Sequence, residues 1–160
     1  MRLMQSLDSA NRVAAAALAP VHPAFLAALR VYVSWQFLKS GWLKVQDWDT
    51  TRVLFEEEYH VPLLSPVVAA ALGTAGELVF PVLLIAGLLG RYAAAGLSAV
   101  NLVAVLAYAH VLTSDGFEAA LGQHYFWGLM LATLLVFGPG RWSVDGWLER
   151  RPAARRPAAG

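Results

Sequence analysis

The sequence predicts an all-α integral membrane protein, a four-helix bundle whose helices run alternately up and down. Of its 160 residues, 58% are hydrophobic and 14% are charged, whereas a soluble domain carries about 25% charged residues. The apolar residues also fall into four long blocks, and about 20 apolar residues cross the hydrocarbon core of a bilayer as one helix. The expected spans are 23–43, 65–89, 92–112 and 118–137, within a membrane domain of 23–148.

The N-terminal segment, 1–22, is expected to be a cytoplasmic lead-in to the first span. It has a short Ala-rich run but no sustained apolar stretch of signal-peptide type. The first span then carries Arg30 and Lys39, with Lys44 at its end. Helical spacing places Arg30 and Lys44 on one face and Lys39 on another, from which Lys39 can extend to the bilayer surface.

The segment 45–64 is expected to be an acidic loop between the first two spans. Its carboxylates are Asp47, Asp49, Glu56, Glu57 and Glu58. A short helix over 50–59, with Asp49 as its N-cap, is expected to lie on the membrane surface.

The second span, 65–89, contains a single carboxylate, Glu77, near its middle. Pro81 follows one turn later and has no backbone N–H, so it frees a carbonyl near the midplane. This arrangement is common where a helix lines a site, although many membrane helices kink with no function.

Short joints separate the last three spans. The stretches "LGRY" (89–92) and "TSDG" (113–116) contain helix-breaking residues, so consecutive helices are expected to be antiparallel. A Gly-Pro-Gly sequence ends the fourth span. The final segment, 149–160, is rich in Pro, Ala and Arg and is expected to be a disordered basic tail.

The distribution of arginine predicts that both termini are cytoplasmic. Cytoplasmic segments of membrane proteins carry an excess of Lys and Arg. With the expected spans, only Arg52, and Lys44 at the edge, fall on the outer side. The arginines on the inner side are Arg2, Arg12, Arg91, Arg141, Arg150, Arg151, Arg155 and Arg156.

Ionisable residues inside the spans are the candidate functional residues, because each costs about 2.5–3.5 kcal/mol to insert at mid-span. From the helical rise, Glu77 is expected near the midplane and Asn101 slightly to its cytoplasmic side. Arg30 is expected nearer the cytoplasmic end, at a depth difference that the long Arg and Glu side chains can close. We expect an ion pair between Arg30 and Glu77, with Asn101 as a neutral hydrogen-bond partner. Two interpretations remain open at this stage: a structural brace between the first two helices, or a proton- or ligand-binding site.

A second group of polar residues is expected at the outer mouth of the bundle. His110 ends the third span and His124 begins the fourth, so hairpin topology gives them similar depth. Lys44 and His60 can approach the same mouth. The histidines are scattered without metal-motif spacing, so no metal site is assigned, and His60, His110 and His124 are only weak candidates for metal ligands.

The composition excludes several other functions. The chain has no cysteine, which rules out disulfides, thiolate nucleophiles, cysteine-bound iron–sulfur clusters and CxxCH haem attachment. The net charge is +1, and no basic stretch is interleaved with stacking aromatics, so nucleic acid binding is not indicated.

The polar residues and turns together resemble the DoxX family of small bacterial membrane proteins. The pattern is Arg30, "SGWLK" (40–44), "GELVFPVLL" with Glu77, "GLLGR" (87–91) and "FGPGRWSVD" (137–145). It covers nearly the whole membrane part. The positions that match the family pattern are Arg30, Lys44, Glu77, Arg91, Arg141 and Asp145; His110 and His124 are not part of it.

The resemblance implies a four-helix bundle in the bacterial inner membrane. It also suggests an accessory role in a membrane redox process, because relatives are associated with quinol oxidase, with thiosulfate:quinone oxidoreductase and with oxidoreductase complexes. The resemblance implies an interaction with quinone or with a redox partner. It is also compatible with a homo-oligomer.

Other relatives accompany the biosynthesis of copper-binding peptides, so transport or copper handling is one alternative. A non-catalytic scaffold for a partner enzyme is another. A haem between His110 and His124 is the least favoured cofactor. The family positions carry no assigned reaction, so the resemblance does not decide whether the protein is an enzyme.

Overall fold

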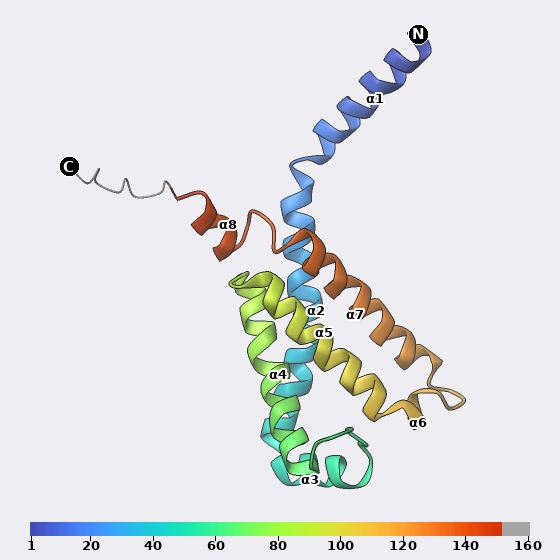
Figure 1. The fold of residues 1–160 in the computed structure, drawn as a ribbon, viewed down its shortest axis with the longest axis vertical. Helices are drawn as coiled ribbons and strands as arrows, with labels where there is room; N and C mark the ends of the chain where they lie inside the picture. Colours follow the sequence, from blue (N-terminus) through green and yellow to red (C-terminus); the bar gives the residue numbers. More distant parts are fainter. Residues whose placement is uncertain (152–160) are drawn as a thin grey trace, which may run out of the picture.

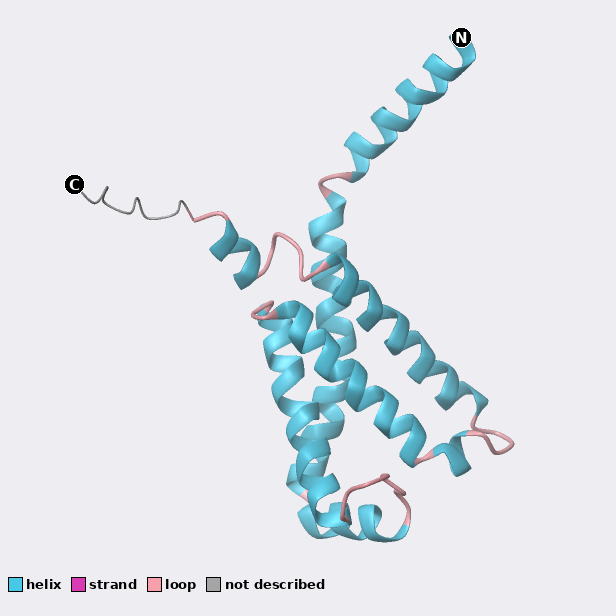
Figure 2. Cartoon of the chain, in the orientation of Figure 1, coloured by secondary structure: helices cyan, strands magenta, loops and turns pink. Residues whose placement is uncertain are grey.

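The computed structural model describes residues 1–151, and every regular element in them is an α-helix. Figures 1 and 2 show α2, α4, α5 and α7 as a bundle, with α3 across one end and α8 near the other. The all-α bundle is therefore confirmed. The helices are α1 (Arg2–Leu18), α2 (Val21–Gln46), α3 (Trp48–Glu57), α4 (Pro66–Ala86), α5 (Gly90–Ala107), α6 (Ala109–Leu112), α7 (Glu118–Phe137) and α8 (Val144–Glu149).

The bundle has the helix lengths that a membrane requires. Among the described residues, α4, α5 and α7 are each long and apolar enough to cross a bilayer. α2 meets the same criterion only together with α1, from which it is bent by 50°. Residues 1–151 thus contain three membrane-length helices, or four if α1 and α2 count as one broken span, which agrees with a multi-pass membrane protein.

The N-terminal segment differs from a plain lead-in because residues 2–18 form the helix α1. Its residues are exposed wherever the side chain is described, and Figure 1 shows the helix projecting away from the bundle. No glycine interrupts the Ala-rich run, which favours helix even without tertiary contacts. The C-terminal tail predicted to be disordered lies mostly outside the described residues.

The third span ends earlier than predicted. α5 stops at Ala107, Tyr108 leaves helical geometry (φ −112°, ψ 18°), and the short α6 follows. The carbonyl of Ala107 accepts a hydrogen bond of 3.0 Å from the backbone N–H of His60 instead of continuing the helix. A loop distant in sequence therefore sets this boundary, and the local apolar pattern contains no sign of it.

The expected surface helix is present, but its N-cap is Asp47 and not Asp49. The Asp47 carboxylate accepts from the hydroxyl and the backbone N–H of Thr50, at 2.7 and 3.0 Å. These hydrogen bonds favour the charged carboxylate and lower the pKa of Asp47. Helix α3 consequently starts at Trp48, immediately after α2, and buries Thr51 and Phe55 against the bundle.

The main core fills the half of the bundle nearer α8. It is built from large aliphatic side chains of all four long helices, including Val33, Leu84, Leu97 and Leu134. A separate, smaller cluster around Phe55 and the alanines of α4 lies under α3. The space between the two clusters is where the polar residues of α2 and α4 meet.

Candidate functional site

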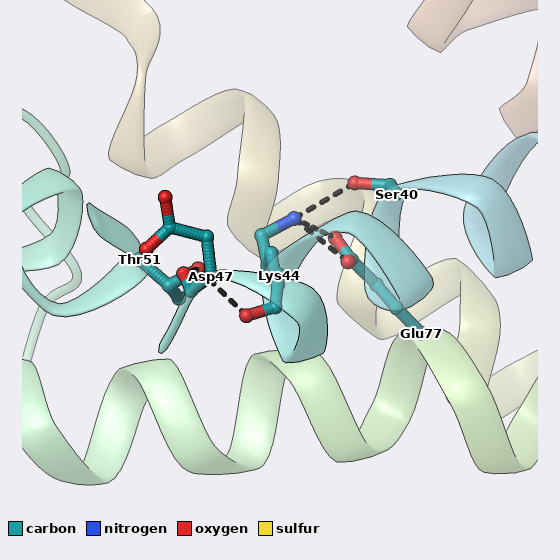
Figure 3. Close-up of polar contacts among 5 residues, drawn as sticks. All are labelled: Ser40, Lys44, Asp47, Thr51 and Glu77. Carbon is teal, nitrogen blue, oxygen red and sulfur yellow. Dashed lines mark hydrogen bonds and ion pairs between the residues drawn. The ribbon is translucent and has the colours of Figure 1, made fainter. Parts of the chain in front are cut away.

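The centre of the candidate site is an ion pair between Lys44 of α2 and Glu77 of α4. Lys44 Nζ lies 2.7 and 2.9 Å from the two carboxylate oxygens, and 2.7 Å from the hydroxyl oxygen of Ser40. Figure 3 shows the ammonium between these two partners. Only 12% of the lysine side chain and 11% of the glutamate side chain are exposed, so the pair is nearly removed from solvent.

The prediction that Glu77 pairs with Arg30 is wrong, and the direction of helical side chains explains why. Side chains in a helix point back toward its N-terminus. Because α2 and α4 are antiparallel, Lys44 points toward the middle of the bundle while Glu77 points toward the α3 end, and the two converge. Arg30 is on the same helix as Lys44 and also points toward the N-terminus of α2. From its position this directs the side chain toward α8 and away from Glu77.

Close packing of α2 and α4 allows this pair to form. A side chain at Gly41 would place its Cβ 2.9 Å from the Cβ of Glu77 and 3.0 Å from Leu78. Glycine lets the two backbones approach, as small residues do between membrane helices. The lysine one turn further along α2 can then reach the carboxylate without extending into solvent.

Arg30 instead belongs to a polar cluster at the α8 end. Its Nη2 donates to the Trp142 carbonyl at 2.5 Å, and Nη1 makes a longer contact of 3.5 Å with the Leu84 carbonyl. The side chain is 3% exposed. The Leu84 carbonyl lies in the last turn of α4, where a cation is favoured by the helix dipole, so Arg30 joins α2, α4 and the segment before α8.

Two further family positions close helix ends in the same region. The Asp145 carboxylate accepts from the backbone N–H groups of Leu89 and Gly90, at 2.9 and 2.8 Å, and so caps the start of α5. Arg91 donates to the last-turn carbonyls of Leu135 and Val136 in α7, at 2.6 Å each. These positions secure the bundle, whereas Lys44 and Glu77 border a cavity.

The cavity has a volume of about 470 Å³ and is lined by α2, α4, α5, the loop after α3 and the first turns of α7. Figure 1 shows that α4 and α5 meet at their turn and diverge toward the α3 end. Phe80 of α4 closes the narrow part by packing against Gly96, where any Cβ would overlap its ring. The cavity therefore occupies the wide part of the wedge-shaped space between α4 and α5.

The lining of the cavity is mostly apolar, with the ion pair in its wall. Leu72 of α4 and Val103 of α5 both border it and are 59% and 40% exposed. Both residues lie within apolar helices that are long enough to cross a membrane. The cavity is thus bordered by α4 and α5, two of the membrane-length helices.

Tyr59, in the loop after α3, borders the cavity at the α3 end. Burial, together with the negative charge of Glu77, raises the pKa of Tyr59 to about 12. Its ring packs edge-on against Tyr108 at 5.0 Å, and the Tyr108 hydroxyl donates to Glu58 at 3.0 Å. These contacts hold the loop over the end of the cavity.

Asn101 and His124 form a second polar pair. The Asn101 amide nitrogen donates to the His124 carbonyl at 3.0 Å, and its oxygen lies 2.8 Å from His124 Nδ1. The ring also packs edge-on against Trp127 at 4.9 Å, and His124 and Trp127 both border the cavity. Asn101 therefore orients the histidine and does not contact Glu77.

The histidines do not meet at one mouth as expected. His110 lies beside His60, with ring centroids 5.0 Å apart, while His124 is held by Asn101. Within residues 1–151, no three His, Cys, Asp or Glu side chains gather as a metal ion would require.

Three residues of the site were not predicted from the sequence, namely Ser40, Tyr59 and Trp127. Ser40 stands one turn before Lys44 on the same helix face, so its position carried a usable signal. Tyr59 and Trp127 carried none, because both resemble ordinary aromatic residues at a membrane interface.

The fold and site define a class: a multi-pass membrane protein with a buried ion pair in the wall of a mostly apolar cavity. Within that class, a model of the DoxX family matches residues 25–110, more than half of the chain. The chain therefore belongs to the DoxX family. No curated protein and no solved structure matches it.

Proposed function

We propose that this DoxX family protein is an accessory subunit of a membrane redox process in the bacterial inner membrane and that it binds a quinone. The observation that carries the proposal is the Lys44–Glu77 pair in the wall of a mostly apolar cavity between membrane-length helices. Ligand pockets typically combine apolar walls with a few placed polar groups. A quinone has the matching form, a small polar head on a long apolar tail.

Filling the cavity should weaken quinone binding. Ala99 of α5 borders the cavity, whereas Ala95, one turn earlier, does not, although both residues are exposed. Ala99→Phe is expected to weaken binding of a decyl-tailed quinone by at least about tenfold, the effect of losing about 1.4 kcal/mol. Binding would be followed by quenching of tryptophan fluorescence in lipid nanodiscs.

The matched control is Ala95→Phe, which adds the same side chain to α5 one turn away, outside the cavity lining. It should bind quinone as tightly as the parent protein. Equal binding by both variants would show that the quinone does not occupy this cavity, and no binding by the parent protein would overturn the proposed function itself.

The proposal includes an orientation with both termini in the cytoplasm, supported by the arginine distribution. A cysteine at Val53 on α3, which is 56% exposed, should react with an impermeant thiol reagent in whole cells. A cysteine at Gln5 on α1 should react only after the membrane is opened. The native chain has no cysteine to interfere, and the opposite labelling pattern would reverse the orientation.

A further inference from the structure

The helix α1 carries an exposed apolar stripe along its length. Its larger members are Met4, Leu7 and Leu18, at spacings of three and eleven residues that place them on one face of the helix. They are between 62% and 73% exposed, and no described residue of α1 belongs to either apolar cluster of the bundle. Asn11 is the polar exception on this face. The stripe is therefore not covered by the described part of the chain.

The opposite face of α1 is polar and positively charged. The residues that share it, at intervals of three or four, are Arg2, Gln5, Ser9 and Arg12. Asp8 is the one acidic residue of the helix, so two positive charges stand against one negative charge. Arginine on a polar face, opposite a face of larger apolar side chains, is typical of helices that lie on a membrane surface.

The joint between α1 and α2 continues the stripe into the bundle. Ala19 and Pro20 keep right-handed helical dihedrals, at φ −53°, ψ −41° and φ −71°, ψ −23°. The helical spacing therefore carries across the joint, and the exposed side chains of Val21 and Phe25 follow Leu18 on the same face. Because α2 packs against α4 and α7, the stripe of α1 runs onto the outer side of a bundle helix.

Two prolines favour a bend of α1 toward the stripe. A proline ring clashes with the carbonyl four residues earlier, which opens the helix on the side of the proline. By helical spacing, Pro20 and the buried Pro23 lie opposite the stripe, so the angle between the helices closes on the side of the stripe. A tilt of α2 in the same direction by about 20–40°, added to the bend of 50°, brings α1 to about 70–90° from the membrane normal.

The end of the bundle from which α1 leaves also has the aromatic residues of a membrane–water interface. Trp142 and Trp147, before and within α8, are 64% and 50% exposed, and tryptophan is enriched at the level of the lipid headgroups. Figure 1 shows α8 and α1 at the same end of the bundle. Arg30 of α2 donates to the Trp142 carbonyl, which ties this level to the helix that follows α1.

We propose that α1 is an interfacial helix that binds an anionic lipid surface. Its apolar stripe enters the boundary between headgroups and acyl chains, and Arg2 and Arg12 attract the anionic headgroups. The bilayer is the occupant because the stripe runs without interruption onto a helix of the membrane bundle and because the net charge of α1 is positive. The cavity and its ligand play no part in this inference, so it does not rest on quinone binding.

Spin labels on single cysteines locate the two faces of α1 in the full-length protein. The native chain has no cysteine, and the protein would be placed in nanodiscs that contain phosphatidylglycerol. A label at Leu7 should lie about 5–10 Å below the lipid phosphates and collide mainly with oxygen. A label at Ser9, on the polar face, should collide mainly with a water-soluble nickel chelate.

Matched substitutions test the stripe and the charge separately, with the label at Ala14. Leu7→Glu should move the label toward water, whereas Val13→Glu, which adds the same charge at a similarly exposed position outside the stripe, should not. The double variant Arg2→Gln with Arg12→Gln should lower the ratio of bound to free α1 by about fivefold per arginine in phosphatidylglycerol. In phosphatidylcholine alone it should match the parent protein.

The labels also identify the results that would overturn the inference. A label at Leu7 that the chelate reaches as freely as at Ser9 would mean that α1 stands free of the bilayer. A label at Leu7 shielded from both oxygen and chelate would mean that the stripe packs against protein, such as a second copy of this chain. An unchanged ratio in the double arginine variant would overturn the role of anionic lipid. Each variant retains the core of the bundle, to which no described residue of α1 belongs.

Discussion

Lys44→Met and Glu77→Gln are each expected to lower the free energy of unfolding by about 3–5 kcal/mol, the usual cost of removing one partner of a buried ion pair. Lys44→Met leaves a carboxylate among apolar side chains. Glu77→Gln leaves an ammonium with neutral acceptors alone, the hydroxyl of Ser40 and the amide oxygen of the new side chain. Both side chains are about nine-tenths buried, so water can do little to solvate the charge that is left without its partner. Thermal unfolding in mild detergent, followed by size-exclusion chromatography, measures the loss.

The double variant Lys44→Met with Glu77→Leu is the decisive control. It removes both charges together, and a buried ion pair can often be replaced by apolar side chains with little loss of stability. Much of the folded yield should therefore return. The variant Arg30→Leu with Glu77→Leu should show no such recovery, because these residues are not partners and their costs should add.

The same variants distinguish two roles of the Lys44–Glu77 ion pair, a brace between α2 and α4 or a part of the ligand site. If the pair serves only to hold α2 against α4, the stable double variant should bind quinone like the parent protein. We expect it to fold and yet to lose binding of the ligand, since the cavity no longer has a charged group. Recovery of both stability and binding would show that the ion pair is a structural brace only and that it contributes nothing to the quinone site.

Much of the fold could be predicted from the sequence because the membrane imposes helix length. Glu77, Lys44 and Arg30 were identified for the same reason, since each is conspicuous in an apolar block. Their pairing was not predictable from depth alone. Arg30 and Glu77 appeared close along the membrane normal, but antiparallel helices direct the two side chains apart, and only the direction of each helix reveals this.

The cavity was beyond the reach of sequence patterns. It exists because α4 and α5 diverge from their turn, and because Phe80 packs against Gly96 at the narrow part of the wedge. Its α3 end is covered by a loop that bonds to Ala107 from a distant part of the chain. Contacts between remote segments decide both features, whereas hydrophobic periodicity reports only on one helix at a time.

Arg30→Leu is expected to lower the free energy of unfolding by about 3 kcal/mol, since hydrogen bonds to charged groups contribute about 1.5–3 kcal/mol each. The Trp142 carbonyl would lose its guanidinium donor, and the Leu84 carbonyl its nearby cation. Arg30→Lys should recover only part of the loss, because a single ammonium lacks the planar fork of donors that spans the two carbonyls.

The matched control is Lys39→Leu, which removes a charge from an exposed position of the same helix and should change stability by no more than about 0.5 kcal/mol. Hydrogen exchange then locates the effect. Arg30→Leu should speed exchange at Leu89 and Gly90, whose N–H groups are held by Asp145, because Arg30 fixes the segment that carries this carboxylate. Lys44→Met should leave exchange there unchanged relative to the rest of the bundle. Faster exchange at the α3 end instead would mean that Arg30 supports the cavity after all, and that the two polar clusters act as one.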